Sequence, residues 1–172
     1  NYVPWKPLEI ILKKLILIDA NALVHRAFHA LPPLTSPDGL VVNAVYGFTS
    51  VLIKAIKDMK PDYMAAAFDL AGPTFRHEEY EEYKAHRKKA PDELYAQIPI
   101  IKEILRAFGV EIFEQAGFEA DDLIGSVAEE AKKVEGLQTI VLTGDLDTLQ
   151  LVDNDKILIL TLSKGVTDTM LY

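Results

Sequence analysis

The chain has 172 residues, the length of one globular domain, and its 49% apolar and 26% charged residues are typical of a folded protein rather than a disordered one. It has no cysteine, which excludes disulfides, zinc–thiolate sites and cysteine nucleophiles, and the cytoplasm is the expected compartment. A net charge of −8 by itself argues against general nucleic-acid binding, because phosphate contacts need basic side chains. That objection is weaker when charge is read by position, because residues 84–89 carry four of the 18 basic side chains.

Hydrophobic periodicity predicts the elements in the first part of the chain. Residues 14–18 form a short apolar run typical of a buried strand, and residues 20–30 fit a helix. Residues 31–40 contain three prolines and a glycine, which indicates a loop. A core-facing helix is expected to begin at Asn43, which is available as its N-cap, and to end before Pro61.

A second strand is expected at residues 63–68, and a charged segment without apolar periodicity follows it. A helical stripe from Leu94 to Phe108 ends at Gly109, and Pro99 should kink or interrupt that helix. Further strands are predicted at 110–113, 139–143 and 157–162, and further helices at 120–133 and 147–151. No apolar run is long enough to span a membrane, and residues 1–13 are treated as an N-terminal extension outside the functional domain.

Strands that alternate with helices in this way predict an α/β fold, with a mostly parallel twisted sheet and helices on both faces. In such sheets the functional crevice lies beyond the carboxyl ends of the strands. We therefore expect one domain over residues 14–172, with its site at that edge.

Acidic residues gather where these predicted strands end. Asp19, Asp69 and Asp145 each follow a short apolar run, so three strands deliver an acid to one edge of the sheet. A second group, Glu119, Asp121 and Asp122, lies where a loop enters a helix. A further acid, Asp147, follows two residues after Asp145. Carboxylates that converge in this way repel one another unless cations are bound.

Oxygen ligands without cysteine, and without histidine in the clusters, select Mg²⁺ or Mn²⁺ over zinc or copper. Two such ions about 4 Å apart can clamp a phosphodiester. A structural alternative exists for each acid alone, because an Asp after a strand is usually an N-cap or turn residue. Asp122 is also open to an outer-shell role, since adjacent helical residues point about 100° apart.

Basic and aromatic side chains lie between Asp69 and the next core helix. Aromatic rings interleaved with cations suit single-stranded nucleic acid, and the residues are Phe75, Arg76, Tyr80, Tyr83, Lys84, His86, Arg87, Lys88 and Lys89. Four glutamates in the same stretch leave a solvated amphipathic helix as the alternative. On the first helix, His25 and Arg26 are candidates for substrate contact, although an arginine there could equally balance the surplus acid.

Ordered motifs across the chain carry a family resemblance. They read Leu-Ile-Asp-Ala-Asn before Arg-Ala-Phe-His-Ala, Ala-Val-Tyr-Gly-Phe at 44–48, Phe-Asp at 68–69, Phe-Arg-His-Glu at 75–78, Tyr-Lys-Ala-His-Arg at 83–87, Glu-Ala-Asp-Asp at 119–122 and Thr-Gly-Asp-Leu-Asp at 143–147. From Lys14 to Tyr172 the chain resembles the 5′ nuclease domain of bacterial DNA polymerase I, in the PIN-like superfamily.

The resemblance implies a Mg²⁺-dependent 5′-3′ exonuclease and flap endonuclease that hydrolyses phosphodiester bonds in replication and repair. Its expected partners are DNA with a 5′ flap, nick or free 5′ end and a polymerase domain on the same chain. It implies a helical arch over residues 70–91, with Arg76, Lys84 and Arg87 as catalytic residues and Tyr83 beside the 5′ strand. It places Arg26 near the scissile phosphate and makes the seven acids the metal residues.

The sequence departs from the family pattern at Leu146, where the family often has lysine. The family also continues past Tyr172 into a further acidic motif and an element that grips duplex DNA, so we expect the first metal site to be more complete than the second. Two other functions stay open. One is a non-catalytic nucleic-acid-binding module. The other is a Mg²⁺-dependent phosphohydrolase with Asp19 as nucleophile, although that chemistry commonly uses a second acid at the position of Asn21.

Overall fold

The computed structural model describes residues 12–70, 72, 90–166 and 168–172. Its centre is a six-stranded sheet in the order β3–β2–β1–β4–β5–β6. The strands from β3 to β5 are parallel, and β6 pairs antiparallel with β5. The strands are β1 Lys13–Asp19, β2 Tyr63–Ala67, β3 Glu111–Phe113, β4 Leu137–Thr143, β5 Ile157–Lys164 and β6 Asp168–Leu171.

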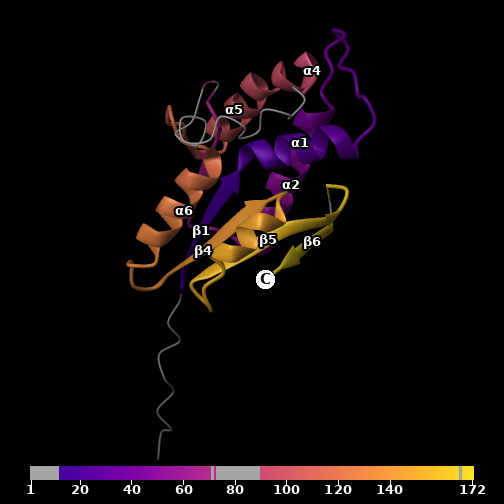
Figure 1. Ribbon diagram of the computed structural model, residues 1–172. Coiled ribbons are helices and arrows are strands. Elements are labelled where there is room, and N and C mark those ends of the chain that lie inside the picture. Colours follow the sequence, from indigo (N-terminus) through magenta and orange to yellow (C-terminus); the bar gives the residue numbers. More distant parts are fainter. Residues whose placement is uncertain (1–11, 71, 73–89, 167) are drawn as a thin grey trace, which may run out of the picture.

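Helices pack on both faces of this sheet (Figure 1). One face is covered by α1 Ala20–Ala30, α2 Asn43–Met59, α4 Asp92–Tyr95 and α5 Ile98–Ala107. The other face is covered by α6 Ala120–Ala131, with the short 3-10 helix η1 Leu146–Leu151 beside it. The predicted α/β class, with a mostly parallel sheet between helices, is confirmed.

Alternation along the central strands explains why both faces can be covered. In β1, Ile16 and Ile18 are buried in the core under α1 and α2, whereas Leu17 is buried in the core under α6. A parallel strand buried on both faces needs a continuous apolar run, and β1 and β4 both have one. The strand pairings are in register up to their carboxyl ends, where Asp19 lies opposite Ala67.

The structure corrects the predicted role of Asn43. The N-cap of α2 is Val42, and Asn43 is the first helical residue, with its buried side chain donating to the carbonyl of Phe28 at 2.9 Å. The helix start is instead satisfied by Gln97, whose amide oxygen accepts from the backbone N–H of Ala44 at 2.8 Å. A glutamine from another element therefore replaces the expected local cap.

Other boundaries differ from the predictions in smaller ways. The stripe from residue 94 to 108 is divided into α4 and α5, with Pro99 in the first turn of α5, so the predicted interruption is confirmed. Strand β6 was not predicted, and β2 ends one residue before Phe68. Of the helices in the described ranges, none is both long and apolar enough to cross a membrane.

Candidate metal and phosphodiester site

The carboxyl edge of the sheet holds three acids delivered by three adjacent strands. Asp19 is the last residue of β1, Asp69 lies two residues after β2, and Asp145 lies two residues after β4. Because β2, β1 and β4 are neighbours and parallel, their carboxyl ends meet at one edge. The strand order therefore confirms that the three acid-bearing strands end at one edge of the sheet.

Asp19 is the most buried of the seven acids, with 3% of its surface exposed. It caps α1, its Oδ1 accepting from the backbone N–H of Ala22 at 3.1 Å, while its Oδ2 accepts from the hydroxyl of Thr143 at 2.7 Å. The pKa of Asp19 is raised to about 6, chiefly by burial and to a smaller extent by the negative charges of Asp121 and Asp69, while the two hydrogen bonds act to lower it. Ionising this carboxylate in the folded protein therefore costs more free energy than ionising it in water, and a nearby cation would offset that cost.

Asp69 joins three elements of the edge. Its Oδ2 accepts from Asn21 Nδ2 at 3.0 Å, and its backbone N–H donates to Asn21 Oδ1 at 3.2 Å, so one amide side chain contacts both parts of the residue. Its Oδ1 accepts from the backbone N–H of Ala120, the first residue of α6, at 2.6 Å. Asp69 is thus held between the starts of α1 and α6, and both helix dipoles favour negative charge there.

The acids at the start of α6 have capping roles as well as the predicted metal role. Glu119 is the N-cap, and it forms a capping box with Asp122, whose Oδ2 accepts from the backbone N–H of Glu119 at 3.0 Å. The structural alternative for Glu119 and Asp122 is therefore present in the fold. Asp121 is exposed in the same first turn, and its charge acts on Asp19.

The turn after β4 carries Asp145 and Asp147. Asp145 caps η1, and its Oδ1 accepts from the backbone N–H of Asp147 at 3.0 Å. Its own backbone N–H donates to Thr143 Oγ1 at 3.0 Å. Gly144 allows this turn to approach α1, because a Cβ there would lie 3.0 Å from the carbonyl oxygen of Ala22.

The donor set at this edge consists of carboxylate oxygens, which suit Mg²⁺ or Mn²⁺. Within the described ranges, no three His, Asp or Glu side chains are grouped closely enough to hold an ion as they stand. Several of the carboxylates instead accept hydrogen bonds from backbone N–H groups, as Asp69, Asp122 and Asp145 do. The chemistry of the donors fits a hard divalent cation, and the assignment of the seven acids as ligands stays a prediction.

Of the two candidate substrate residues on α1, Arg26 is turned toward the β5–β6 turn. Its guanidinium donates to the carbonyls of Ser163 and Gly165, both at 3.5 Å. His25 is half-buried, with its ring centroid 6.2 Å from that of His29. The predicted arch residues Arg76, Tyr83, Lys84 and Arg87 lie outside the described residues, as does most of the predicted arch segment 70–91.

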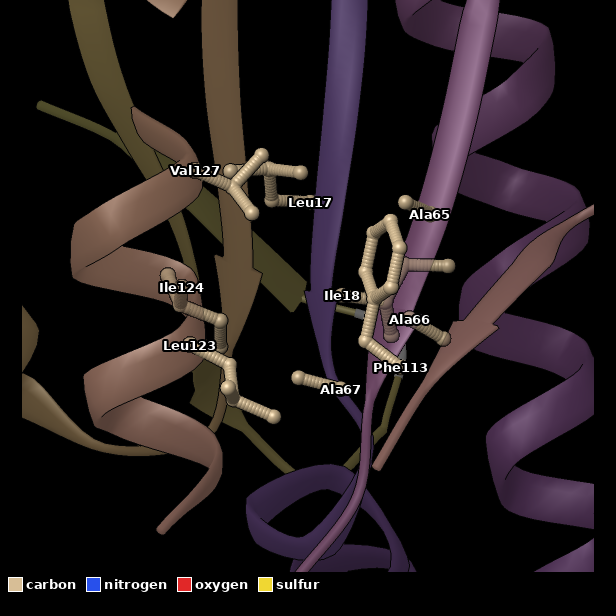
Figure 2. Close-up of a pocket in the computed structure, with 9 residues that line it drawn as sticks. All are labelled: Leu17, Ile18, Ala65, Ala66, Ala67, Phe113, Leu123, Ile124 and Val127. Atoms are coloured by element: carbon tan, nitrogen blue, oxygen red, sulfur yellow. The ribbon is translucent and has the colours of Figure 1, made fainter. Parts of the chain in front are cut away.

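An apolar hollow lies next to the acidic edge, between α6 and strands β1 to β3. Figure 2 shows Leu123, Ile124 and Val127 extending from α6 toward the sheet, where β2 presents Ala65 and Ala67 on the same face. Its lining carries no group for phosphate chemistry. The small side chains of β2 let α6 pack closely, which allows the N–H of Ala120 to contact Asp69.

Two neutral residues of the site were not selected from the sequence. Thr143 bonds both Asp19 and the backbone of Asp145, and Asn21 bonds Asp69. Their adjacency to predicted acids, at positions 143 and 21, was the available signal.

Comparisons with known proteins identify relatives of this chain. The family model described as "5′-3′ exonuclease, N-terminal resolvase-like domain" matches residues 14–171. DNA polymerase I of Caldicellulosiruptor bescii is 50% identical over 142 residues, which cover 83% of this chain and 17% of that protein. DNA polymerase I of Bacillus subtilis is 45% identical over 160 residues, which cover 93% of this chain and 18% of that protein.

A solved structure of the bacteriophage T5 flap endonuclease, in a pseudo-enzyme–product complex with DNA and metal ions, has the same fold with a TM-score of 0.68. Its sequence identity is 14%, and the match covers 93% of this chain and 57% of that chain. This chain spans less than a fifth of the two polymerases, at 17% and 18% of their lengths. The chain belongs to the family of 5′-3′ exonuclease N-terminal, resolvase-like domains.

Proposed function

We propose that this domain is the divalent-metal-dependent 5′ nuclease of a bacterial DNA polymerase I, and that it hydrolyses phosphodiester bonds in DNA with a 5′ flap, nick or free 5′ end. Its metal is Mg²⁺ or Mn²⁺, its compartment is the cytoplasm, and a polymerase domain lies on the same chain. The observation that carries the proposal is the delivery of Asp19, Asp69 and Asp145 to one edge by three adjacent parallel strands. The family match and the polymerase I relatives support it.

The residues that would hold the ions are the three strand-end acids, together with the other acids of the edge, Glu119, Asp121, Asp122 and Asp147. Two bound divalent cations would supply an activated water and stabilise the leaving oxygen of the phosphodiester. The protein provides fixed acceptors, because Asp19 and Asp69 are each held by at least two hydrogen bonds. The starts of α1 and α6 add positive dipole ends beside them.

The basic segment before α4 is the proposed contact for the 5′ strand. Arg76, Lys84 and Arg87 supply cations that the acidic edge lacks, and Tyr83 supplies a ring on which a base can stack. His25 and Arg26 are proposed to contact the strand near the scissile phosphate. Contact by Arg26 requires its guanidinium to leave the carbonyls of Ser163 and Gly165, which it meets at the long distance of 3.5 Å.

The covalent phosphohydrolase is disfavoured by the surroundings of Asp19. A nucleophilic carboxylate needs an accessible oxygen, yet Asp19 is 3% exposed and both of its oxygens accept hydrogen bonds. Position 21, where that chemistry commonly has a second acid, holds an amide engaged with Asp69. A metal-activated water needs no exposed nucleophilic side chain.

The test is cleavage of three DNAs of the same sequence: a 5′ flap, a blunt duplex and a single strand. Both this chain and the longest natural protein that contains it are incubated with each DNA in Mg²⁺ and in EDTA. We expect cleavage near the flap junction that EDTA abolishes and that Mn²⁺ restores. No cleavage by either protein, or cleavage that persists in EDTA, would overturn the proposal.

A further inference from the structure

A single threonine hydroxyl connects two of the strand-end acids. Thr143 is the last residue of β4, and its side chain is fully buried, with 0% exposed surface. Its hydroxyl donates to Asp19 Oδ2 at 2.7 Å and accepts from the backbone N–H of Asp145 at 3.0 Å. We propose that Thr143 is a positioning residue that fixes Asp19 and Asp145 relative to each other for divalent-metal binding, an inference that rests on the proposed function.

The orientation of the Asp19 carboxylate depends on this hydroxyl. Its Oδ1 is held by the N–H of Ala22, within its own helix start, and that bond alone leaves the carboxylate free to turn about it. The bond from Thr143 to Oδ2 adds a second fixed point from a strand 124 residues away. Two bonds to two oxygens determine the plane of the carboxylate, which a metal ligand needs.

The same hydroxyl sets the position of Asp145 through its backbone. The carbonyl of Asp145 accepts from Thr148 Oγ1 at 2.8 Å, and its carboxylate accepts from the N–H of Asp147. Both of those contacts lie within the turn that Asp145 begins. The bond between the N–H of Asp145 and Thr143 ties this turn to the end of β4 and, through Thr143, to Asp19.

The neighbouring strand offers a matched control. Thr161 of β5 is the register partner of Thr143 and is also buried, at 2% exposed. Its hydroxyl has no hydrogen-bond partner within the described part of the chain. The two threonines share residue type, burial and position across the sheet, and they differ in whether the hydroxyl contacts an acid.

The experiment compares Thr143→Val and Thr161→Val with the wild-type chain. Mn²⁺ binding is measured directly by isothermal titration calorimetry. Flap cleavage is measured over a range of Mn²⁺ and DNA concentrations. Loss of an outer-shell partner weakens metal binding by about 10- to 100-fold. We expect this loss in Thr143→Val, together with a lower kcat and an unchanged KM for DNA, and we expect wild-type values in Thr161→Val.

A second pair of variants separates positioning from folding. Thr143→Ser keeps the hydroxyl and Thr143→Ala removes it, while both lose the same methyl group. The serine variant should bind Mn²⁺ within about threefold of wild type, and the alanine variant should show the full loss of about 10- to 100-fold. This comparison decides the question even if Thr143→Val fails to fold.

Equal Mn²⁺ affinity in the serine and alanine variants would overturn the positioning role. So would Thr143→Val with wild-type Mn²⁺ binding, or a loss in Thr161→Val as large as that in Thr143→Val. The proposed function fails differently, because then the wild-type protein itself would neither bind Mn²⁺ at this edge nor cleave the flap.

Discussion

Replacing Asp19 by asparagine should stabilise the metal-free chain, although it removes a proposed metal ligand. Burial raises the pKa of Asp19 from 3.8 to about 6, so the folded protein holds this proton more tightly than the unfolded chain. The neutral carboxyl therefore contributes stability that is fully present below about pH 4 and is lost as the pH rises through about 6. Asparagine keeps the shape without the charge, and its carbonyl can still cap α1.

The size of the effect follows from the pKa. The rise from 3.8 to about 6 corresponds to about 3 kcal/mol of lost stability at pH values well above 6, at about 1.36 kcal/mol for each pKa unit. At about pH 4.5 the same linkage gives a loss of about 1 kcal/mol. The difference in free energy of unfolding between Asp19→Asn and wild type should therefore be about 2 kcal/mol more favourable to the variant at about pH 8 than at about pH 4.5. Using this difference cancels any constant effect of replacing the bond from Thr143, which is worth about 1 kcal/mol.

The assay is urea unfolding of both chains in EDTA at the two pH values, with Asp155→Asn as the control. Asp155 is exposed in the turn before β5, at the opposite edge of the sheet, so its replacement should leave the pH dependence unchanged. Addition of Mg²⁺ at pH 8 should stabilise wild type more than Asp19→Asn, because the cation compensates the carboxylate. A gain that does not grow with pH, or an equal gain in Asp155→Asn, would refute the reasoning.

Two further predictions concern the turn after β4 and the basic segment. Gly144→Ala places a Cβ 3.0 Å from the Ala22 carbonyl oxygen, so it should lower the free energy of unfolding by about 1–3 kcal/mol and reduce flap cleavage. In Gly125→Ala, the control in α6, the nearest atom to the new Cβ lies at 3.9 Å, so this variant should be neutral or stabilising in urea unfolding. In a fluorescence-anisotropy titration, Lys84→Ala should weaken DNA binding and reduce the slope of log affinity against log salt concentration by about 0.7. The control Lys57→Ala, in the last turn of α2, should change neither the affinity nor the slope. An unchanged slope in Lys84→Ala, or full stability and activity in Gly144→Ala, would contradict these expectations.

The strand-end acids could be located from the sequence because their placement depends on local patterns alone. A short apolar run followed by Asp predicts a buried strand and its carboxyl end, and parallel pairing then brings Asp19, Asp69 and Asp145 to one edge. The distant hydrogen bonds could not be predicted in this way. Thr143 contacts an acid 124 residues away and Gln97 caps a helix 53 residues away, and no local pattern specifies such partners.

The misplaced features have physical reasons of the same kind. Asn43 is a good N-cap by type, but burial against α1 and the amide of Gln97 draws its side chain into a tertiary network instead. Strand β6 has four residues and little apolar alternation, and it forms because β5 offers it an edge. Arg26 could not be assigned to the β5–β6 turn until that hairpin was known.

The most direct test of whether the acidic edge is the nuclease centre is the cleavage rate of a 5′-flap DNA at saturating Mg²⁺. The rate of Asp145→Asn is compared with that of Asp155→Asn, both made in the longest natural protein that contains this chain. Asp145 lies at the carboxyl edge beside Thr143, whereas Asp155 lies at the other end of the strands. We expect Asp145→Asn to lose at least about 100-fold in rate, the upper end of the loss for an outer-shell partner, and Asp155→Asn to match wild type. Equal rates in the two variants would contradict a metal-dependent nuclease centre at this edge.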